Sequence, residues 1–213
     1  MTEASPQPRQ RLHGRGALIV FEGIDGAGKS TQMRGLVAWL KALGWEVVAD
    51  REPTDQPHGR RLRESAVTGR LSPSEELDLF IADRRQHVAE VIGPALEQGQ
   101  VVVLDRYYHS NAAYQGSRGL DWRGILRRNE DFAPRPDLVL WLDVDPAVSG
   151  ARIRGRGDSA NQFERIDQLQ RCREIYASLG DPSIRRIDGA RDEASVTADV
   201  RGAVEGLLRS REA

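Results

Sequence analysis

The chain has 213 residues, a formal net charge of −1 at pH 7 and 30% charged residues. This length predicts one domain that can bury a core, and the balanced charge does not favour nucleic acid or an anionic membrane as a partner. The single cysteine, Cys172, excludes an internal disulfide and a cysteine-rich metal site. No apolar run approaches the roughly 18 residues of a membrane-spanning helix.

The chain begins with a polar stretch. Residues 1–16 are rich in Arg, Gln and Pro and lack the apolar segment of a signal peptide. We expect residues 1–16 to be a disordered tail and residues 17–213 to be a single domain. The absence of a disulfide framework fits a cytoplasmic location.

A glycine-rich segment follows the first apolar run. Residues 17–21 predict a buried strand, and the apolar positions of residues 33–43 recur with the spacing of an amphipathic helix. The segment between them reads G-x-x-x-x-G-K-S, and this context predicts a phosphate-binding loop rather than a chance glycine-rich turn. The residues expected to hold nucleotide phosphates are Gly23, Ile24, Asp25, Gly26, Ala27, Gly28, Lys29, Ser30 and Thr31.

Two side chains of this loop have distinct chemical roles. Lys29 places an ammonium beside the outer phosphates, and the Ser30 hydroxyl can ligate Mg²⁺. Lysine occurs only at positions 29 and 41 in a chain that otherwise uses arginine. Lys29 therefore supplies a compact point charge at the position where a phosphate is expected to bind.

The next strand is expected at residues 46–49, with Arg51 following its carboxyl end. Short strands that alternate with helices predict an α/β fold with a parallel sheet, in which ligands bind at the carboxyl ends of the strands. Arg51 is therefore a candidate phosphate contact, and the alternative is a solvated loop arginine. Residues 58–70 predict a short basic helix.

A long helix is expected to start at Ser72 or Ser74, which are good N-caps, and to run to about residue 92. Arg84 interrupts its apolar stripe, four residues after Phe80 and four before Val88. A charge on that face must be paired or must face a ligand. Two interpretations stay open: an internal ion pair, or a cleft wall in which Phe80 stacks on a flat ring and Arg84 binds its edge.

Residues 101–104 predict a core strand that ends in Asp105 and Arg106. Asp105 can hold magnesium-bound water beside the phosphate loop, and Arg106 can neutralise phosphate charge. Ser110, Asn111 and Tyr114 then fall on adjacent helical positions and could face one cleft. The alternative is a helix cap with a packed tyrosine.

The rest of the chain continues the alternation, with strands at residues 138–142 and 184–187 and helices from Pro146, at residues 165–179 and at residues 192–209. Asp143 and Asp145 compete with Asp105 as acidic strand-end residues. Arg152, Arg154 and Arg156 form a basic stretch that can close over a transferring phosphoryl group, unless it is only a solvated charge run.

Together these features resemble the thymidylate kinase family, from about Ala17 to the end of the chain. The resemblance implies the three-layer P-loop kinase fold, with a five-stranded, mostly parallel sheet, helices on both faces and a mobile lid at about residues 152–165. The segments that carry it are Phe21 to Thr31, Arg51-Glu52-Pro53, Leu79 to Arg84, Asp105-Arg106-Tyr107, Ser110 and Ala113 to Gly116.

For the acceptor nucleoside, the resemblance implies that Phe80 stacks on thymine and Arg84 contacts its carbonyl edge. Ser110 and Asn111 would lie near the base. Tyr114 would lie under the deoxyribose, where its bulk disfavours a 2′-hydroxyl.

For phosphoryl transfer, the resemblance implies ATP and dTMP as substrates and direct transfer between them. Arg51 and Arg106 would hold the acceptor phosphate, and Asp25 would lie near the 3′-hydroxyl and the network of metal-bound waters. Catalysis would rest on Lys29, Arg106, Mg²⁺ and the lid arginines, and members of the family are commonly homodimers.

The chain departs from the family in one loop. Many thymidylate kinases read Arg-Glu-Pro-Gly-Gly-Thr, whereas residues 51–57 read R-E-P-T-D-Q-P. The added carboxylate, Asp55, would weaken monophosphate binding if it pointed inward.

Two other functions are compatible with the same loop. A kinase for another monophosphate or for a nucleoside is the first, and a nucleoside acceptor needs a carboxylate base, for which Glu22 is a candidate. The second is a nucleotide-dependent switch or binding protein. A switch needs no second nucleotide pocket, so the residues around Phe80 and Asn111 argue against it.

Overall fold

The computed structural model describes residues 10–69, 71–154 and 162–212. Its strands are β1 (Ala17–Glu22), β2 (Val47–Arg51), β3 (Val101–Asp105), β4 (Leu138–Asp143) and β5 (Ile184–Asp188). Its helices are α1 (Lys29–Ala42), α2 (Pro57–Thr68), α3 (Pro73–His87), the π-helical η1 (Val88–Ile92), α4 (Gly93–Glu97), α5 (Tyr108–Ser117), α6 (Trp122–Glu130), α7 (Pro146–Arg154), α8 (Gln162–Ser178) and α9 (Glu193–Glu212).

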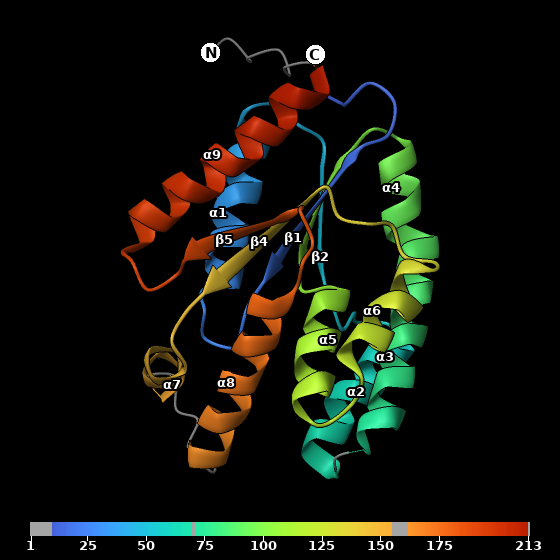
Figure 1. Cartoon of the computed structure of the whole chain (residues 1–213). Helices are drawn as coiled ribbons and strands as arrows, with labels where there is room; N and C mark the ends of the chain where they lie inside the picture. The colour runs from blue at the N-terminus through green and yellow to red at the C-terminus, as the bar shows by residue number, and fades with distance from the viewer. Residues whose placement is uncertain (1–9, 70, 155–161, 213) are drawn as a thin grey trace, which may run out of the picture.

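The strands form a five-stranded sheet in the order β2-β3-β1-β4-β5, and every pair is parallel. The α/β fold class and the P-loop kinase architecture are confirmed. The pairing is wholly parallel within the described residues, where mostly parallel was expected. Because all carboxyl ends face one way, the loops after β1, β2 and β3 meet at the end where α2, α3, α5 and α8 gather (Figure 1).

Successive side chains of a strand point to opposite faces of the sheet, and this alternation divides the core into two layers. Ile19 and Phe21 of β1 face α1 and α9, whereas Leu18 and Val20 face η1 and α4 on the opposite side (Figure 1). This is the pattern of a central strand that is buried on both faces. A smaller apolar cluster joins α3, α5 and α6 and fixes the helices that surround the site described below.

The expected long helix is divided into three parts. Its start is as expected, because Ser72 and Glu75 form a capping box. The α-helix ends at His87, and η1 and α4 follow. Pro94 gives the physical reason: a proline lacks the N–H of the regular ladder and its ring crowds the carbonyl four residues earlier, so the wider π turn accommodates it.

The N-terminal prediction needs a correction for residues 10–16. Gln10 pairs with Trp45 in a parallel bridge, and the buried Leu12 donates its N–H to Gly99 O at 2.9 Å. These residues therefore pack on the domain. Residues 1–9 lie outside the described part of the chain. Within that part, none of the helices combines the length and hydropathy that crossing a bilayer requires.

Candidate active site

The glycine-rich segment joins β1 to α1 as a compact loop. Gly28 is the N-cap of α1 with φ of 98°, and the space where a Cβ would stand is open. Gly23 has φ of 138°, and a Cβ there would lie 2.5 Å from Leu142 O. Both positions therefore require glycine. The loop places a helix N-terminus and its backbone N–H groups beside open space, which is the arrangement that binds phosphate.

Lys29 lies buried within this loop. Its Nζ donates to Gly23 O at 3.0 Å and to Ile24 O at 2.9 Å. Burial, together with the nearby Arg106 guanidinium, lowers the pKa of Lys29 to about 8. The ammonium is thus hydrogen-bonded to loop carbonyls, and the nearby carboxylates of Asp25, Asp105 and Glu22 favour its charged form, which an anion in the loop would stabilise further.

Ser30 and Asp105 meet next to the loop. Ser30 Oγ donates to Asp105 Oδ2 at 2.6 Å, and the other carboxylate oxygen, Oδ1, is buried and has no hydrogen-bond partner among the described residues. The competing Asp143 is bound by Arg173 at 2.6 Å and Arg186 at 2.5 Å. Asp105 therefore lies beside the phosphate loop, and its expected role in holding magnesium-bound water stays a prediction.

A cavity of about 240 Å³ lies beside the phosphate loop, with walls from α2, α3 and α5. Glu52, Tyr107, Arg63 and Gln115 contribute to its walls, as does Asp25 of the loop itself. The cavity also brings together most of the side chains that the sequence assigns to an acceptor nucleotide, namely Phe80, Arg84, Arg106, Ser110, Asn111 and Tyr114.

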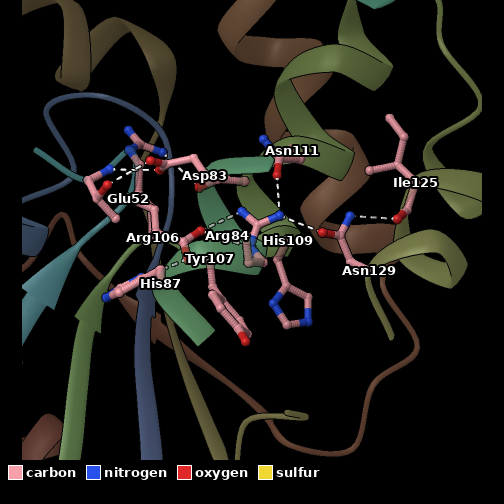
Figure 2. Close-up of polar contacts among 12 residues, drawn as sticks. Glu52, Asp83, Arg84, His87, Arg106, Tyr107, His109, Asn111, Ile125 and Asn129 are labelled. Atoms are coloured by element: carbon pink, nitrogen blue, oxygen red, sulfur yellow. Dashed lines mark hydrogen bonds and ion pairs between the residues drawn. The ribbon is translucent and has the colours of Figure 1, made fainter. Parts of the chain in front are cut away.

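Arg84 is buried in the wall of this cavity. Its Nε and Nη2 donate to Glu52 Oε2 at 2.8 and 2.5 Å, and its Nη1 donates to Asn111 Oδ1 at 2.7 Å and Asn129 Oδ1 at 2.5 Å. Figure 2 shows the guanidinium between these three partners, and its planar fork also lies over the Tyr107 ring. The two interpretations of Arg84 are thus compatible: it forms an internal ion pair and also borders the cavity.

Arg106 connects the phosphate loop to α5. Its φ of 72° lies in the left-handed region, which non-glycine residues rarely adopt and which is enriched at functional sites. Its Nη1 donates to Gly23 O at 3.2 Å and Ser110 Oγ at 3.0 Å, while its Nη2 donates to Asp25 Oδ1 at 2.5 Å and Tyr114 OH at 3.3 Å. The guanidinium therefore stands between the loop and the cavity.

A family model described as thymidylate kinase matches residues 21–200. The chain belongs to the thymidylate kinase family. Curated thymidylate kinases of Xanthomonas campestris pv. campestris (strain B100) and Xylella fastidiosa (strain M12) are 50% and 48% identical to it over 196 residues. The matched region covers 92% of this chain and 86% and 90% of those two relatives.

The loop that departs from the family motif is anchored at Thr54. Thr54 is buried, and its N–H and hydroxyl donate to the two oxygens of Asp83 at 2.8 and 2.6 Å. The neighbouring Asp55 points outward, where it binds Arg51 at 3.1 Å and Arg63 at 2.6 Å. Neither Arg51 nor Asp55 contributes to the cavity wall, so of the expected substrate contacts Arg51 is the one that stands apart.

Only part of the expected lid can be described. Arg152 donates to Gly189 O through both terminal nitrogens at 3.1 Å and so ties α7 to the loop after β5. Arg156 and the side chain of Arg154 lie outside the described residues. The expected roles of these arginines remain predictions.

Glu22 is placed differently from a catalytic base. Its carboxylate is fully buried and accepts from Tyr107 N at 2.9 Å, Ser110 Oγ at 2.6 Å and Tyr176 OH at 2.8 Å. It also accepts from Ser110 N at 3.1 Å and thereby caps the start of α5. These donors occupy the carboxylate within the protein interior, and Glu22 is not among the described residues that line the cavity, so it is not placed to take a proton from a substrate hydroxyl.

Several residues of the site were missed from the sequence. Asn129 lies on α6, a helix that the sequence analysis did not predict, although Asp121 before it is an N-cap signal. Glu52 belongs to a recognised motif, but its pairing with Arg84 requires β2 and α3 to be adjacent. His87, which contacts Glu52, had no signal beyond its helical position.

Proposed function

We propose that this protein transfers the γ-phosphoryl group of ATP to dTMP, giving ADP and dTDP. The observation that carries the proposal is the junction at Arg106, where the phosphate loop adjoins a cavity that carries an aromatic ring, an amide and a buried guanidinium. Membership of the thymidylate kinase family supports dTMP as the acceptor.

The chemistry would need no side-chain base. A phosphate oxygen of dTMP attacks the γ-phosphorus in line, the bond to the β,γ-bridging oxygen breaks, and its electron pair leaves with ADP. The acceptor phosphate is already an anion, so catalysis consists of positioning and charge neutralisation. Lys29 and Arg106 carry these charges in the proposal, and Asp25 holds Arg106 beside the transferred group.

The donor set at Ser30 and Asp105 fits Mg²⁺. One carboxylate with an unpartnered oxygen and one hydroxyl are hard oxygen ligands, and Mg²⁺ in such sites takes one or two protein ligands together with substrate phosphates. No group of three or more His, Cys, Asp or Glu side chains is placed to hold a metal within the described ranges. When bound, the ion supplies neutralisation of charge on the β- and γ-phosphates.

In the cavity, Phe80 would stack on thymine, and Arg84 and Asn111 would bind its polar edge, with Ser110 nearby. Tyr114 would lie under the deoxyribose. Its hydroxyl accepts from Asp25 N at 3.0 Å, which holds the ring against the loop. We further propose that the protein is a homodimer and that it is cytoplasmic. Light scattering of the purified protein tests the first, and fractionation of the cells that make it tests the second.

The deciding experiment measures ADP release from ATP and Mg²⁺ with dTMP, dUMP, UMP, dCMP, GMP, AMP and thymidine in turn. We expect turnover to be strongest with dTMP. Stronger turnover with another acceptor would move the substrate assignment, and nucleotide binding without any acceptor dependence would favour a switch or binding protein.

A further inference from the structure

A row of alternating charges stands behind the cavity. It runs from Asp50 through His87 and Glu52 to Arg84, with the first and third residues at the end of β2 and the others on α3. Figure 2 shows His87 and Arg84 approaching Glu52 from opposite sides. His87 is not among the described residues that line the cavity, so its effect on a ligand must pass through Glu52.

The two oxygens of Glu52 serve different partners. Oε1 lies 3.0 Å from His87 Nδ1, and Oε2 receives both hydrogen bonds from Arg84. The side chains of Arg84, Glu52 and His87 are 1%, 3% and 1% exposed, respectively. At this depth water cannot replace a lost partner, so each contact constrains the next.

This division determines how the guanidinium is presented. Because His87 occupies Oε1, Glu52 binds Arg84 through one oxygen, on the side of Nε and Nη2. The Nη1 group then donates to Asn111 and Asn129. If Oε1 were released, Glu52 could turn and form a two-oxygen pair with the arginine fork, which is the geometry that carboxylates favour. The guanidinium would then shift relative to Asn111 and to the cavity.

We propose that His87 is a positioning residue for the acceptor nucleotide and acts through Glu52 to fix the orientation of Arg84 in the cavity wall. The inference rests on the proposed function, since it takes the base of dTMP to be the group that Arg84 meets. It adds a residue that does not touch the substrate.

The charge state of His87 fits this role. Burial alone would lower the pKa of His87, but the neighbouring carboxylates outweigh it and raise the pKa to about 9: Asp50, 3.3 Å from Nε2, and Glu52, 3.0 Å from Nδ1. The charged groups that contact it are Asp50, near the end of β2, and Glu52 directly after that strand; Arg84, three residues earlier on the same helix, binds the other oxygen of Glu52. Because the imidazolium separates two carboxylates, its loss removes the cation that keeps Glu52 in place.

The test compares His87→Asn with His87→Leu under saturating ATP. Asparagine can keep a donor near the position of Nδ1 but loses the charge and the contact with Asp50, whereas leucine loses all three. We expect the KM for dTMP to rise about tenfold or more in His87→Leu and by a smaller factor in His87→Asn, as for loss of buried charge-assisted hydrogen bonds. The kcat and the KM for ATP should stay within about twofold of wild type. In the proposed complex the phosphates of both nucleotides contact Lys29 and Arg106 and do not contact Asp50, His87, Glu52 or Arg84.

The pH profile separates positioning from packing. The ratio of wild-type to His87→Asn kcat/KM for dTMP cancels ionisation of the substrate. We expect that ratio to fall toward one as the pH rises through about 9. A ratio that is independent of pH, or an unchanged KM for dTMP in folded His87→Asn, would overturn the inference.

His109→Asn is the matched control. His109 is also buried, 2% exposed, and also stands between two carboxylates: its Nε2 lies 3.5 Å from Asp181 and its Nδ1 lies 4.0 Å from Glu22, which unlike Glu52 does not bind Arg84. The same chemical change there should leave the KM for dTMP unchanged. An equal rise in KM in both variants would show a general packing effect and overturn the inference. Absence of dTMP-dependent ADP release in wild type would instead contradict the proposed function.

Discussion

At the scale of single residues, the site pairs its charges internally. Arg106 binds Asp25, Arg84 binds Glu52, and Lys29 is held by loop carbonyls. Each cation is therefore desolvated and aimed by protein groups rather than by water. Preorganised charges of this kind need little rearrangement when a transferring phosphoryl group arrives.

Replacing Lys29 with alanine should lower kcat by at least about 100-fold while the fold is retained, because a preorganised cation at the phosphates is lost. Coupled ADP release and circular dichroism measure the two quantities. Arg106→Ala should behave similarly. Near-normal turnover in either variant would contradict the proposed mechanism.

The lowered pKa of Lys29 makes ATP use sensitive to pH. Because the ammonium of the free enzyme loses its proton as pH rises through about 8, kcat/KM for ATP should fall progressively above that pH. Initial rates between pH 7 and 9.5 check this expectation. In Lys29→Arg the side chain stays charged at these pH values, so its residual kcat/KM for ATP should not fall above pH 8. An identical fall in that variant would show that another group is responsible.

Asp55 should restrain acceptor binding. Its carboxylate is 74% exposed and binds both Arg51 and Arg63, and Arg63 also borders the cavity. In Asp55→Asn the two guanidinium groups lose their carboxylate partner and can pair with an incoming phosphate instead, so the KM for dTMP should fall. The change should be less than about fivefold because exposed ion pairs are weak. Asp78→Asn, which removes a similarly exposed partner of Arg128, is the matched control; a rise in KM for Asp55→Asn would mean that Asp55 instead orders the arginines.

At the scale of elements, α3 holds the acceptor loop through two successive residues. Asp83 binds Thr54 and Arg84 binds Glu52, so the start of the loop follows the position of the helix. The capping box at Ser72 defines where that helix begins. The stability of the N-terminus of α3 and the shape of the cavity are thus connected, because both depend on the position of this helix.

Ser72→Ala should lower the free energy of unfolding by about 1 kcal/mol, the usual cost of losing an N-cap side chain. Urea unfolding of the whole chain measures it. Ser210→Ala is the matched control, because this exposed serine lies within α9 and its hydroxyl donates to Leu207 O of the same helix; it should change stability much less. Equal losses in both variants would show that the cap is not the source.

Local sequence patterns predict much of this architecture and fail where tertiary contacts decide. The strands and the phosphate loop follow from apolar runs and glycines, and the cavity residues follow from the family motifs. The nine-residue helix α6 was missed because its apolar residues are few and lie between arginines. The π turn follows from Pro94, which an apolar pattern does not register. The single-oxygen pairing of Glu52 depends on neighbours distant in the sequence, which periodicity does not report.

At the scale of the whole molecule, buried titratable groups make stability depend on pH. The folded pKa of His87 is raised, so its contribution is fully present below about 6.5 and is lost as pH rises through about 9. Lys29 acts in the opposite direction, because its folded pKa is lowered and its neutral form is favoured. In wild type the contributions of His87 and Lys29 to the unfolding free energy change over the same pH range. A variant that lacks one of the two groups is needed to measure them separately.

The difference in unfolding free energy between wild type and His87→Asn should therefore shrink as pH rises from 6.5 to above 9. The contribution of Lys29 is common to both proteins and cancels. Urea titrations at pH 6, 8 and 9.5 measure the difference. A constant difference across this range would show that His87 contributes packing alone.

The central strand β1 supports both halves of the site. Phe21 O accepts from Arg106 N at 2.9 Å, and Glu22 caps α5, so the loop for one nucleotide and the helix beside the other start from the same two residues. Because these attachments are made by adjacent residues of one strand, a displacement of β1 would carry both halves of the site together. The distance between the two nucleotides is therefore set where β1 ends. We expect substitutions that bend the strand at this point to misalign the reacting groups even though neither side chain touches them.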